Sequence, residues 1–329
     1  MPVAEDFIST SRLMEVARDA VADSHAFIRQ AMAGGMKFSF EKIHLHPGGP
    51  DEKISLMIDR LAEQSCRSYF ARQVDTHVHV IGEETQGEEI PEARVHALVD
   101  VVDGTDLLAM GIPLWCSAIV LFDEQKPRPI LGAVVGLATG EIYMASHVED
   151  RVTVTLPPTV PDGATLTRLV SGPSSTLTLK NARIAHYGQK PKNFLSLHRL
   201  TRFLGTVESM HRRDPFRIYN FAGNPIMMKL ADRPKDEETG KDLTDGIDAV
   251  FDVSGQLLHD VVPGAFIALK AGAYLCDLDK RPIGYEALGA LLATPKLRLK
   301  YVLAATRNLA EELCDALRDE PPAPGGSAR

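Results

Sequence analysis

The chain has 329 residues, of which 44% are hydrophobic and 24% charged, and its formal charge is −8 at pH 7. These fractions are typical of a soluble globular protein, and the length allows one large domain or two medium ones. The negative charge argues against a nucleic acid or an anionic membrane as the main partner. An acidic protein attracts a phosphate only where something local, such as a bound divalent cation, reverses the field.

The cysteines and the apolar runs bear on the compartment. The first ten residues contain no apolar segment of signal-peptide type, and no run of about 18 uninterrupted apolar residues occurs in the chain. We therefore expect neither a signal peptide nor a membrane span. The chain has four widely spaced cysteines and no CxxC motif, and we expect them to be buried thiols in a reducing cytoplasm. They are Cys66, Cys116, Cys276 and Cys314.

The first half of the chain predicts two helices followed by strands. Apolar residues at three- and four-residue steps predict an amphipathic helix over residues 12–32. A second helix is expected beside the Pro-Gly-Gly-Pro turn that starts at Pro47, with Ile54 and Ile58 on its apolar face. Dense β-branched residues then predict a mixed or antiparallel sheet, with strands at residues 77–80, 95–102, 115–122, 130–137 and 141–145.

The second half predicts alternating helices and strands, which is typical of an α/β layer. Helices are expected at residues 194–210, 225–230, 260–271 and 309–317, and strands at residues 217–219, 248–252, 274–277 and 301–305. The polar residues 233–246 predict an exposed loop. We expect an N-terminal α+β metal-binding domain over residues 1–190, a C-terminal α/β substrate-side domain over residues 191–319, and a disordered tail over residues 320–329.

A pair of aspartates at the end of a predicted strand is the strongest chemical signal. Asp100 ends an apolar run, and Asp103 follows in a tight turn whose backbone freedom comes from Gly104. Two carboxylates so close repel each other unless a cation lies between them, and hard oxygen ligands suit Mg²⁺. The N–H groups of Gly104 and Thr105 offer a resting place for a phosphate oxygen. A strand followed by an Asp-Gly turn with no ligand is the alternative.

Three motifs in this order resemble the signature of the inositol monophosphatase and fructose-bisphosphatase superfamily of lithium-sensitive, metal-dependent phosphatases. That signature reads GEE, then D-P-[IL]-D-G-[TS], then W-D-x-A-[AG]-G at the start of a helix. The chain has GEE at residues 82–84, DVVDGT at residues 100–105 and HDVVPG at residues 259–264. Val101 replaces the proline and His259 the tryptophan. The likeness covers roughly residues 50–310, except 150–215.

This resemblance implies a fold and a set of metal ligands. The implied fold is α/β (α+β), a layered αβαβα sandwich of the sugar-phosphatase type with a mixed N-terminal sheet and a smaller C-terminal α/β layer. Glu83, Asp100 and the backbone carbonyl of Val102 would hold one Mg²⁺ ion. Asp100, Asp103 and Asp260 would hold a second, so two or three ions are expected.

The resemblance also implies the catalytic and substrate-binding residues. Asp51, paired with Thr105, would activate the attacking water beside Glu83, although Asp51 also fits the N-cap of a helix. Gly104 and Thr105 would bind the phosphate. The expected substrate contacts are Gly223, Asn224 and Asp252.

The implied function is that of a phosphoric monoester hydrolase. A Mg²⁺-dependent phosphatase would use a metal-activated water to hydrolyse a small phosphate monoester, such as an inositol phosphate, a sugar phosphate or a bisphosphate. The resemblance implies a homodimer, and the cysteines indicate the cytoplasm. The alternative is a catalytically weak or inactive family member that binds a sugar phosphate or a metal ion. The changes at Val101 and His259 favour that alternative, and the presence of every expected carboxylate ligand counts against it.

Overall fold

The computed structural model describes most of the chain. It covers residues 9–34, 40–45, 53–74, 78–84, 93–123, 126–158, 164–188, 191–198, 200–211, 218–221, 223–236, 238–243, 246–292, 294 and 297–318. None of the helices in these ranges combines the length and the hydropathy that a membrane span needs.

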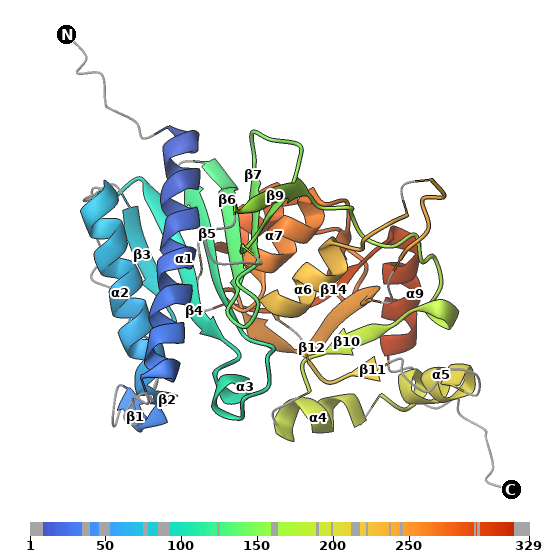
Figure 1. The fold of residues 1–329 in the computed structure, drawn as a ribbon. Coiled ribbons are helices and arrows are strands. Elements are labelled where there is room, and N and C mark those ends of the chain that lie inside the picture. Colours follow the sequence, from blue (N-terminus) through green and yellow to red (C-terminus); the bar gives the residue numbers. More distant parts are fainter. Residues whose placement is uncertain are drawn as a thin grey trace, which may run out of the picture.

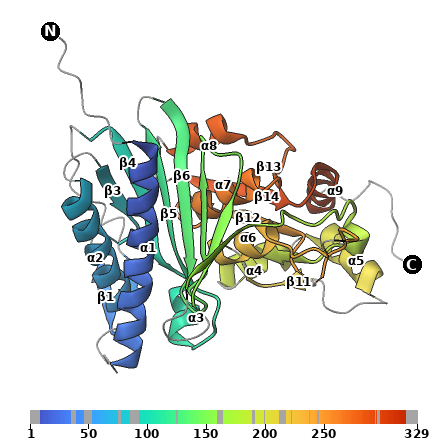
Figure 2. The same cartoon turned by 45° about the horizontal axis from the view of Figure 1, so that its top comes forward.

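Helices and sheets alternate in five layers (Figure 1). The helices α1 (Thr10–Ala33) and α2 (Met57–Val74) pack on the outer face of a seven-stranded sheet. The helices α6 (Asn224–Ala231) and α7 (Val262–Lys270) lie between this sheet and a five-stranded sheet. Figure 2 shows the same order of layers from a second direction.

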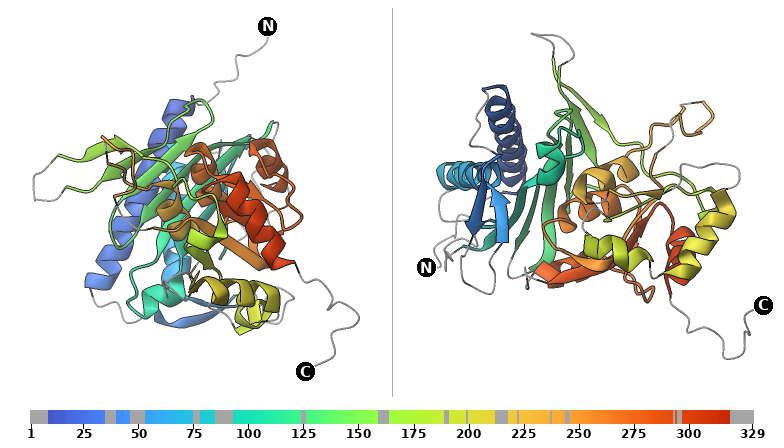
Figure 3. Two further views of the ribbon diagram at one scale, coloured as in Figure 1. Left: turned by 90° about the vertical axis from the view of Figure 1, so that its right-hand side faces the viewer. Right: turned by 90° about the horizontal axis from the view of Figure 1, so that it is seen from below.

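Two more helices, α5 (Thr201–His211) and α9 (Arg307–Leu317), lie beyond the five-stranded sheet, and an apolar cluster joins them to its outer face (Figure 3). The structure therefore confirms the predicted αβαβα sandwich. It also confirms that a larger mixed sheet comes first in the chain and a smaller sheet second.

The seven-stranded sheet has the order β3-β4-β5-β6-β7-β8-β9. The strand β3 runs parallel to β4, and every other neighbouring pair is antiparallel. The strands are β3 (Val78–Gly82), β4 (Val95–Asp103), β5 (Cys116–Asp123), β6 (Lys126–Gly136), β7 (Ile142–Ser146), β8 (Thr153–Leu156) and β9 (Leu166–Leu169).

The five-stranded sheet has the order β11-β10-β12-β14-β13. Its strands are β10 (Ile184–His186), β11 (Ile218–Tyr219), β12 (Ala249–Leu257), β13 (Tyr274–Cys276) and β14 (Arg298–Ala304). The strand β10 precedes residue 190 but pairs with β11 and β12, so the first segment of this sheet lies on the N-terminal side of the expected boundary. The division at residue 190 stays a prediction.

Two sequence predictions of helices are wrong in their details. Ile54 lies in a short strand, β2 (Lys53–Leu56), because its backbone pairs with His44 of β1 (Lys42–Leu45), and α2 begins only after it. The single helix expected at residues 194–210 is two helices, α4 (Pro191–His198) and α5, between which the Leu200 N–H bonds to the Leu197 carbonyl. Two helices were not predicted, α3 (Thr105–Ala109) and α8 (Tyr285–Leu292).

Apolar periodicity determines which face of each element is buried. In α1, buried residues recur at helical spacing, as at Leu13, Val16 and Ala20, and they share a core with the outer-face residues Ile119 and Leu121 of β5. The opposite face of the same sheet joins α6, α7 and the inner face of the five-stranded sheet in one core. This middle layer brings α7 close to the end of β4.

Candidate metal and active site

A bulge in β4 places Asp100 and Asp103 together. Residues three apart in a regular strand point to opposite faces. The pairing of β4 with β5 slips here, because Asp100 lies opposite Ala118 while Asp103 lies opposite Cys116, which leaves one extra residue in β4. Val101 and Val102 accordingly both enter the core under α1 and α2. Both aspartates are thus turned away from that core.

The glycine of the GEE segment has a steric reason. A β-carbon on Gly82 would lie 2.0 Å from the side-chain carbon Cδ of Glu63, so any larger residue would have to displace this buried carboxylate of α2. One Glu63 oxygen accepts a 2.7 Å hydrogen bond from the Glu84 N–H, and the other accepts bonds from Arg67. These contacts hold the end of β3 in place, and Glu83 follows directly.

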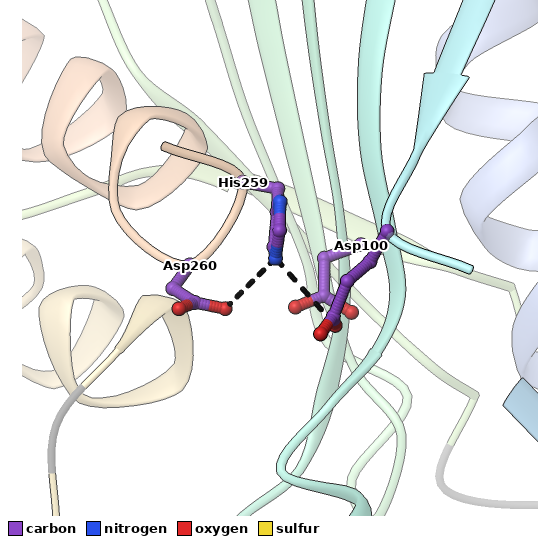
Figure 4. Close-up of side chains that lie close together, drawn as sticks. Asp100, His259 and Asp260 are labelled. Carbon is purple, nitrogen blue, oxygen red and sulfur yellow. Dashed lines mark ion pairs between the residues drawn. The ribbon is translucent and has the colours of Figure 1, made fainter. Parts of the chain in front are cut away.

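His259 and Asp260 come from the short turn between β12 and α7. The Asp260 carboxylate accepts a 3.3 Å bond from the Leu257 N–H, and α7 begins at Val262. His259 is buried, and its Nε2 atom lies 3.5 Å from a Glu83 oxygen and 3.4 Å from an Asp260 oxygen. Figure 4 shows the imidazole ring pointing into the space between Asp260 and Asp100.

Four side chains therefore offer ligand atoms at one point. One atom from each of Glu83, Asp100, His259 and Asp260 lies within 4.8 Å of the others. They come from the end of β3, the end of β4 and the turn before α7, so the packing of α7 against the seven-stranded sheet assembles them. The structure thus brings together three of the expected metal ligands and adds a histidine.

Asp103 is held by Asn224 at the start of α6. One Asp103 oxygen accepts hydrogen bonds from the Asn224 backbone N–H at 2.9 Å and from its side-chain Nδ2 at 3.0 Å. The same Nδ2 donates to the His259 carbonyl at 2.9 Å, and the Oδ1 accepts from the Gly264 N–H at 2.8 Å. Asn224 is fully buried, and its backbone N–H, its Nδ2 and its Oδ1 all form hydrogen bonds within the protein. It joins Asp103 to the segment that carries His259.

Thr105 lies beside an aspartate that sequence reasoning did not select. Its Oγ1 lies 2.9 Å from Oδ1 of Asp59 and 2.9 Å from the Val102 carbonyl. The other Asp59 oxygen accepts bonds from the Ser55 hydroxyl and the Leu56 N–H. Asp51, which we expected at this place, lies outside the described residues. Asp59 and Glu63 both lie on the apolar stripe of α2, with Ala62 and Cys66. Carboxylates on such a stripe are the signal that could have revealed Asp59.

The carboxyl groups carry raised pKa values because they are buried close together. Burial, and next the charge of Asp103, raises the pKa of Asp100 well above its usual range. Burial and then Asp260 raise the pKa of Asp103, although the bonds from Asn224 lower it. Burial and then Glu84 raise the pKa of Asp59 to about 7. Each shift has the direction that a nearby cation would reverse.

The acids open into a cleft of about 650 Å³ between the two sheets. Its basic residues, among those the structure describes, are Lys42 and Arg298, and the Arg298 Nη1 donates to the Gly255 carbonyl at 3.1 Å. The acids that line it are Asp59, Glu83, Glu84, Asp100, Asp103, Asp106 and Asp260. Its wall is therefore strongly negative wherever these groups are ionised.

The residues expected to contact substrate lie behind this wall. Gly223, with φ of +99°, packs on Asp103, and a β-carbon there would lie 3.0 Å from an Asp103 oxygen. Asp252 is buried in β12 and accepts a bond from the Gly255 N–H. Neither they nor Asn224 are among the lining residues, so these contacts support the site from behind. The bulged part of β12 that Asp252 ties down, with Ser254 and Gln256, does line the cleft.

Comparison with known proteins shows which fold the chain has. No protein-family model and no curated protein matches the chain. The structure is similar to that of Mycobacterium tuberculosis SuhB, with 20% identity and a TM-score of 0.61 over 94% of this chain and 96% of that chain. It is similar to Staphylococcal IMPase-I complexed with products, with 14% identity and a TM-score of 0.62 over 95% and 97%. The chain has the inositol monophosphatase fold.

This fold extends over nearly the whole chain. Thermotoga maritima IMPase has 14% identity and a TM-score of 0.62 over 93% of this chain and 96% of that chain. The match confirms the resemblance seen in the three motifs. At 93% coverage it must also include most of residues 150–215, where the sequence alone gave no likeness, so the inositol monophosphatase fold persists where its sequence signal is lost.

The donor set on this inositol monophosphatase fold suits a divalent cation. Three carboxylates and an imidazole converge from three elements, and burial, followed by the charges of Asp103, Glu83 and Asp260, raises the pKa of Asp100. Buried carboxylates in such a group are stable as anions only beside positive charge. Glu83, Asp100 and Asp260 are therefore fitted to hold a metal ion, with His259 beside them.

Proposed function

We propose that this protein is a metal-dependent phosphatase that hydrolyses a small phosphate monoester. The observation that carries the proposal is the convergence of Glu83, Asp100, His259 and Asp260. The three carboxylates of this group line a cleft together with Thr105 and Asp59. Bound divalent cations would supply the charge that neutralises a phosphate and would lower the pKa of an attacking water. We propose Mg²⁺, in two or three ions, as the family expectation for these oxygen ligands.

Charge alone makes a cation necessary for this function. A phosphate dianion that enters the cleft meets seven lining acids and two lining basic residues among the described residues. Without a cation it would be repelled, because like charges in a partly buried site are weakly screened. We propose that Asp103, held by Asn224, contributes its free oxygen to a second ion with Asp100 and Asp260, and that the Val102 carbonyl contributes to the first.

Thr105 and Asp59 are suited to handle the proton of the attacking water. The Thr105 hydroxyl has one proton to donate, to Asp59 or to the Val102 carbonyl, and its lone pairs can accept a bond from water. A proton that leaves the water can pass through Thr105 to Asp59. Burial raises the pKa of Asp59 toward neutrality, which suits a group that accepts a proton near pH 7. We propose Asp59 for the role first expected of Asp51.

The cleft favours a small, polar substrate. A volume of about 650 Å³ is within the range of small-molecule sites. Lys42, Arg298 and Gly255 line the cleft and offer polar contacts to hydroxyl or phosphate groups. An inositol phosphate, a sugar phosphate or a sugar bisphosphate would meet these conditions. A homodimer in the cytoplasm is part of the proposal by resemblance to the family.

The test is phosphate release from a panel of these monoesters, with Mg²⁺ and after its removal by a chelator. We expect turnover only with metal, and a loss of about 100-fold or more in Asp100→Asn, which removes one ligand charge. Asp123→Asn is the matched control, because Asp123 is a buried acid at the opposite end of the β4–β5 pair, where it contacts Arg94.

Two results would reject the phosphatase. One is the absence of turnover for the whole panel with every divalent ion offered, combined with metal binding that Asp100→Asn abolishes. That combination would support the inactive sugar-phosphate or metal-binding module. The other is turnover that Asp100→Asn leaves unchanged, which would place the chemistry elsewhere.

A further inference from the structure

His259 stands where the family signature has tryptophan, and its place in the structure is unusual for a core histidine. Its Nε2 atom lies 3.4 Å from Asp260 and 3.5 Å from Glu83, two of the acids proposed to hold metal. The ring nitrogen points toward the center of this group (Figure 4). Asp100 completes the group from β4, so the imidazole lies among three carboxylates.

The backbone of His259 is fixed in this position. Its carbonyl accepts a 2.9 Å bond from the Asn224 side chain, which also bonds Asp103 and the Gly264 N–H. His259 is 6% exposed. Because the backbone is held and the ring is buried, the imidazole has little freedom to turn away. Its nitrogen therefore faces the three carboxylates.

The separations match those of ligands around one ion. Ligand atoms about 2.1 Å from an octahedral cation are about 3.0 Å apart when adjacent and about 4.2 Å apart when opposite. The distances of 3.4 and 3.5 Å from Nε2 to its two neighbours lie between these values. All four atoms lie within 4.8 Å of each other, so a small closure would bring them onto one ion.

We infer that the His259 Nε2 is a direct ligand of a metal ion bound in the group that it forms with Glu83, Asp100 and Asp260, and that this group binds a first-row transition ion more tightly than Mg²⁺. The inference rests on the proposed metal site and specifies its ion. Mg²⁺ prefers oxygen ligands and retains its waters. Imidazole also binds first-row transition ions, with an affinity that is lower for Mn²⁺ than for Co²⁺ or Zn²⁺. Replacement of tryptophan by histidine thus converts an all-oxygen site into a mixed one.

The other reading of the same distances is that His259 is a cation. A protonated imidazole would form ion pairs with Glu83 and Asp260 and would take the place of part of the metal charge. In that case the nitrogen keeps its proton and never contacts the ion. Direct observation of a metal–nitrogen contact separates the two readings.

The experiment is pulsed EPR of the full-length protein with stoichiometric Mn²⁺, which reports nitrogen nuclei bound to the ion. We expect a ¹⁴N modulation in the wild type, replaced by a ¹⁵N signal when the histidines are labelled with ¹⁵N. It should disappear in His259→Gln and His259→Trp. His147→Gln is the matched control, because His147 follows β7, is half-buried and bonds the Ile130 carbonyl, away from the cleft.

Metal affinities give a second measurement. In His259→Gln we expect the affinity for Mn²⁺ to fall about 10- to 100-fold, and the affinity for Mg²⁺ to change much less. Bound Mn²⁺ without histidine modulation in the wild type would overturn the inference, as would a modulation that survives both substitutions. Bound Mn²⁺ without a histidine signal in the wild type overturns the inference even where a variant fails to fold.

These outcomes are separate from the fate of the proposed function. If the wild type lacks the nitrogen signal but releases phosphate with Mg²⁺, the inference about His259 fails and the phosphatase stands. If the wild type binds neither Mn²⁺ nor Mg²⁺ and releases no phosphate, both fail together.

Discussion

A hydrogen bond between Thr105 and Asp59 joins residues 46 positions apart in the chain. The threonine hydroxyl has a single proton and two acceptors within 2.9 Å, Asp59 and the Val102 carbonyl. Which acceptor receives the proton depends on the ionisation of Asp59. Replacing one carboxylate oxygen of Asp59 by an amide nitrogen would therefore change which group accepts the Thr105 proton.

Asp59→Asn is predicted to abolish proton transfer while it preserves the fold. An asparagine can accept from Ser55 and Leu56 and donate to Thr105, so every hydrogen bond keeps a partner. Thr105 would then donate only to the Val102 carbonyl, and no base would remain. We expect kcat to fall by about 10²- to 10⁴-fold, with Mg²⁺ affinity little changed. Steady-state kinetics and calorimetry test this, and wild-type kcat in the variant would exclude Asp59 as the base.

Asn224→Ala is predicted to weaken metal binding from behind the site. The substitution removes the side-chain bonds to Asp103, to the His259 carbonyl and to the Gly264 N–H. Loss of such a supporting residue lowers metal affinity by about 10- to 100-fold. Titration calorimetry measures the affinity, and the melting temperature of the metal-free protein measures the cost in stability. Unchanged affinity together with a lower melting temperature would leave Asn224 with a structural role alone.

At the scale of elements, the end of β4 shows how one inserted residue creates chemistry. Alternation along a strand is a local rule, and it would place Asp100 and Asp103 on opposite faces. The bulge that overrides it is visible in the pairing of β4 with β5 and in the shared core of Val101 and Val102. The sequence predicted a strand over residues 95–102 but contained no signal for its register against β5.

The contact between β3 and α2 gives a prediction about an element pair. Gly82→Ala places a methyl group against the Glu63 carboxylate, and we expect a loss of about 1–3 kcal/mol of stability and weaker metal binding at Glu83. Glu63→Ala removes the obstacle. The effect of Gly82→Ala should therefore be smaller in the Glu63→Ala background, as measured by a double-mutant cycle of denaturant unfolding. Additive effects would show that another contact excludes a side chain at Gly82.

At the scale of the whole molecule, the converging acids couple stability to pH and metal. A carboxyl whose pKa is higher folded than unfolded holds more protons in the folded state, so its stabilisation is present at low pH and lost as pH rises. Asp59, raised from 3.8 to about 7, and Asp100 and Asp103, also raised, act in this direction. His186, whose burial lowers its pKa from 6.5 to about 4, acts oppositely at lower pH.

We therefore predict that the melting temperature of the metal-free protein falls from about pH 7 to about pH 8, where most of the opposing contribution of His186 is complete. A divalent ion should raise the melting temperature more at the higher pH, because its ligands must be deprotonated to bind. Differential scanning calorimetry with and without metal measures both effects. Asp100→Asn should show a shallower fall, and a melting temperature of the metal-free wild type that rises over this interval would contradict the prediction.

Local patterns sufficed for a large part of this protein. Apolar periodicity predicted α1, and dense β-branched residues predicted β3 to β7 of the large sheet but not β8 and β9. The short acidic motifs identified Glu83, Asp100 and Asp260, because strand ends and helix starts are local features. The motifs also indicated the layered fold, which the structure confirms. The roles of these acids as ligands stay predictions.

Other parts depended on contacts between elements distant in the chain. Only the packing of α2 against β4 brings Asp59 to Thr105, and only the packing of α6 and α7 places Asn224 behind Asp103 and His259 among the acids. In the sequence, His259 is a mismatch to a motif, and the only signal for Asp59 is its place on the apolar stripe of α2. Tertiary structure therefore decided which residues surround the acidic group, because elements distant in the chain must pack together before a buried carboxylate has these neighbours.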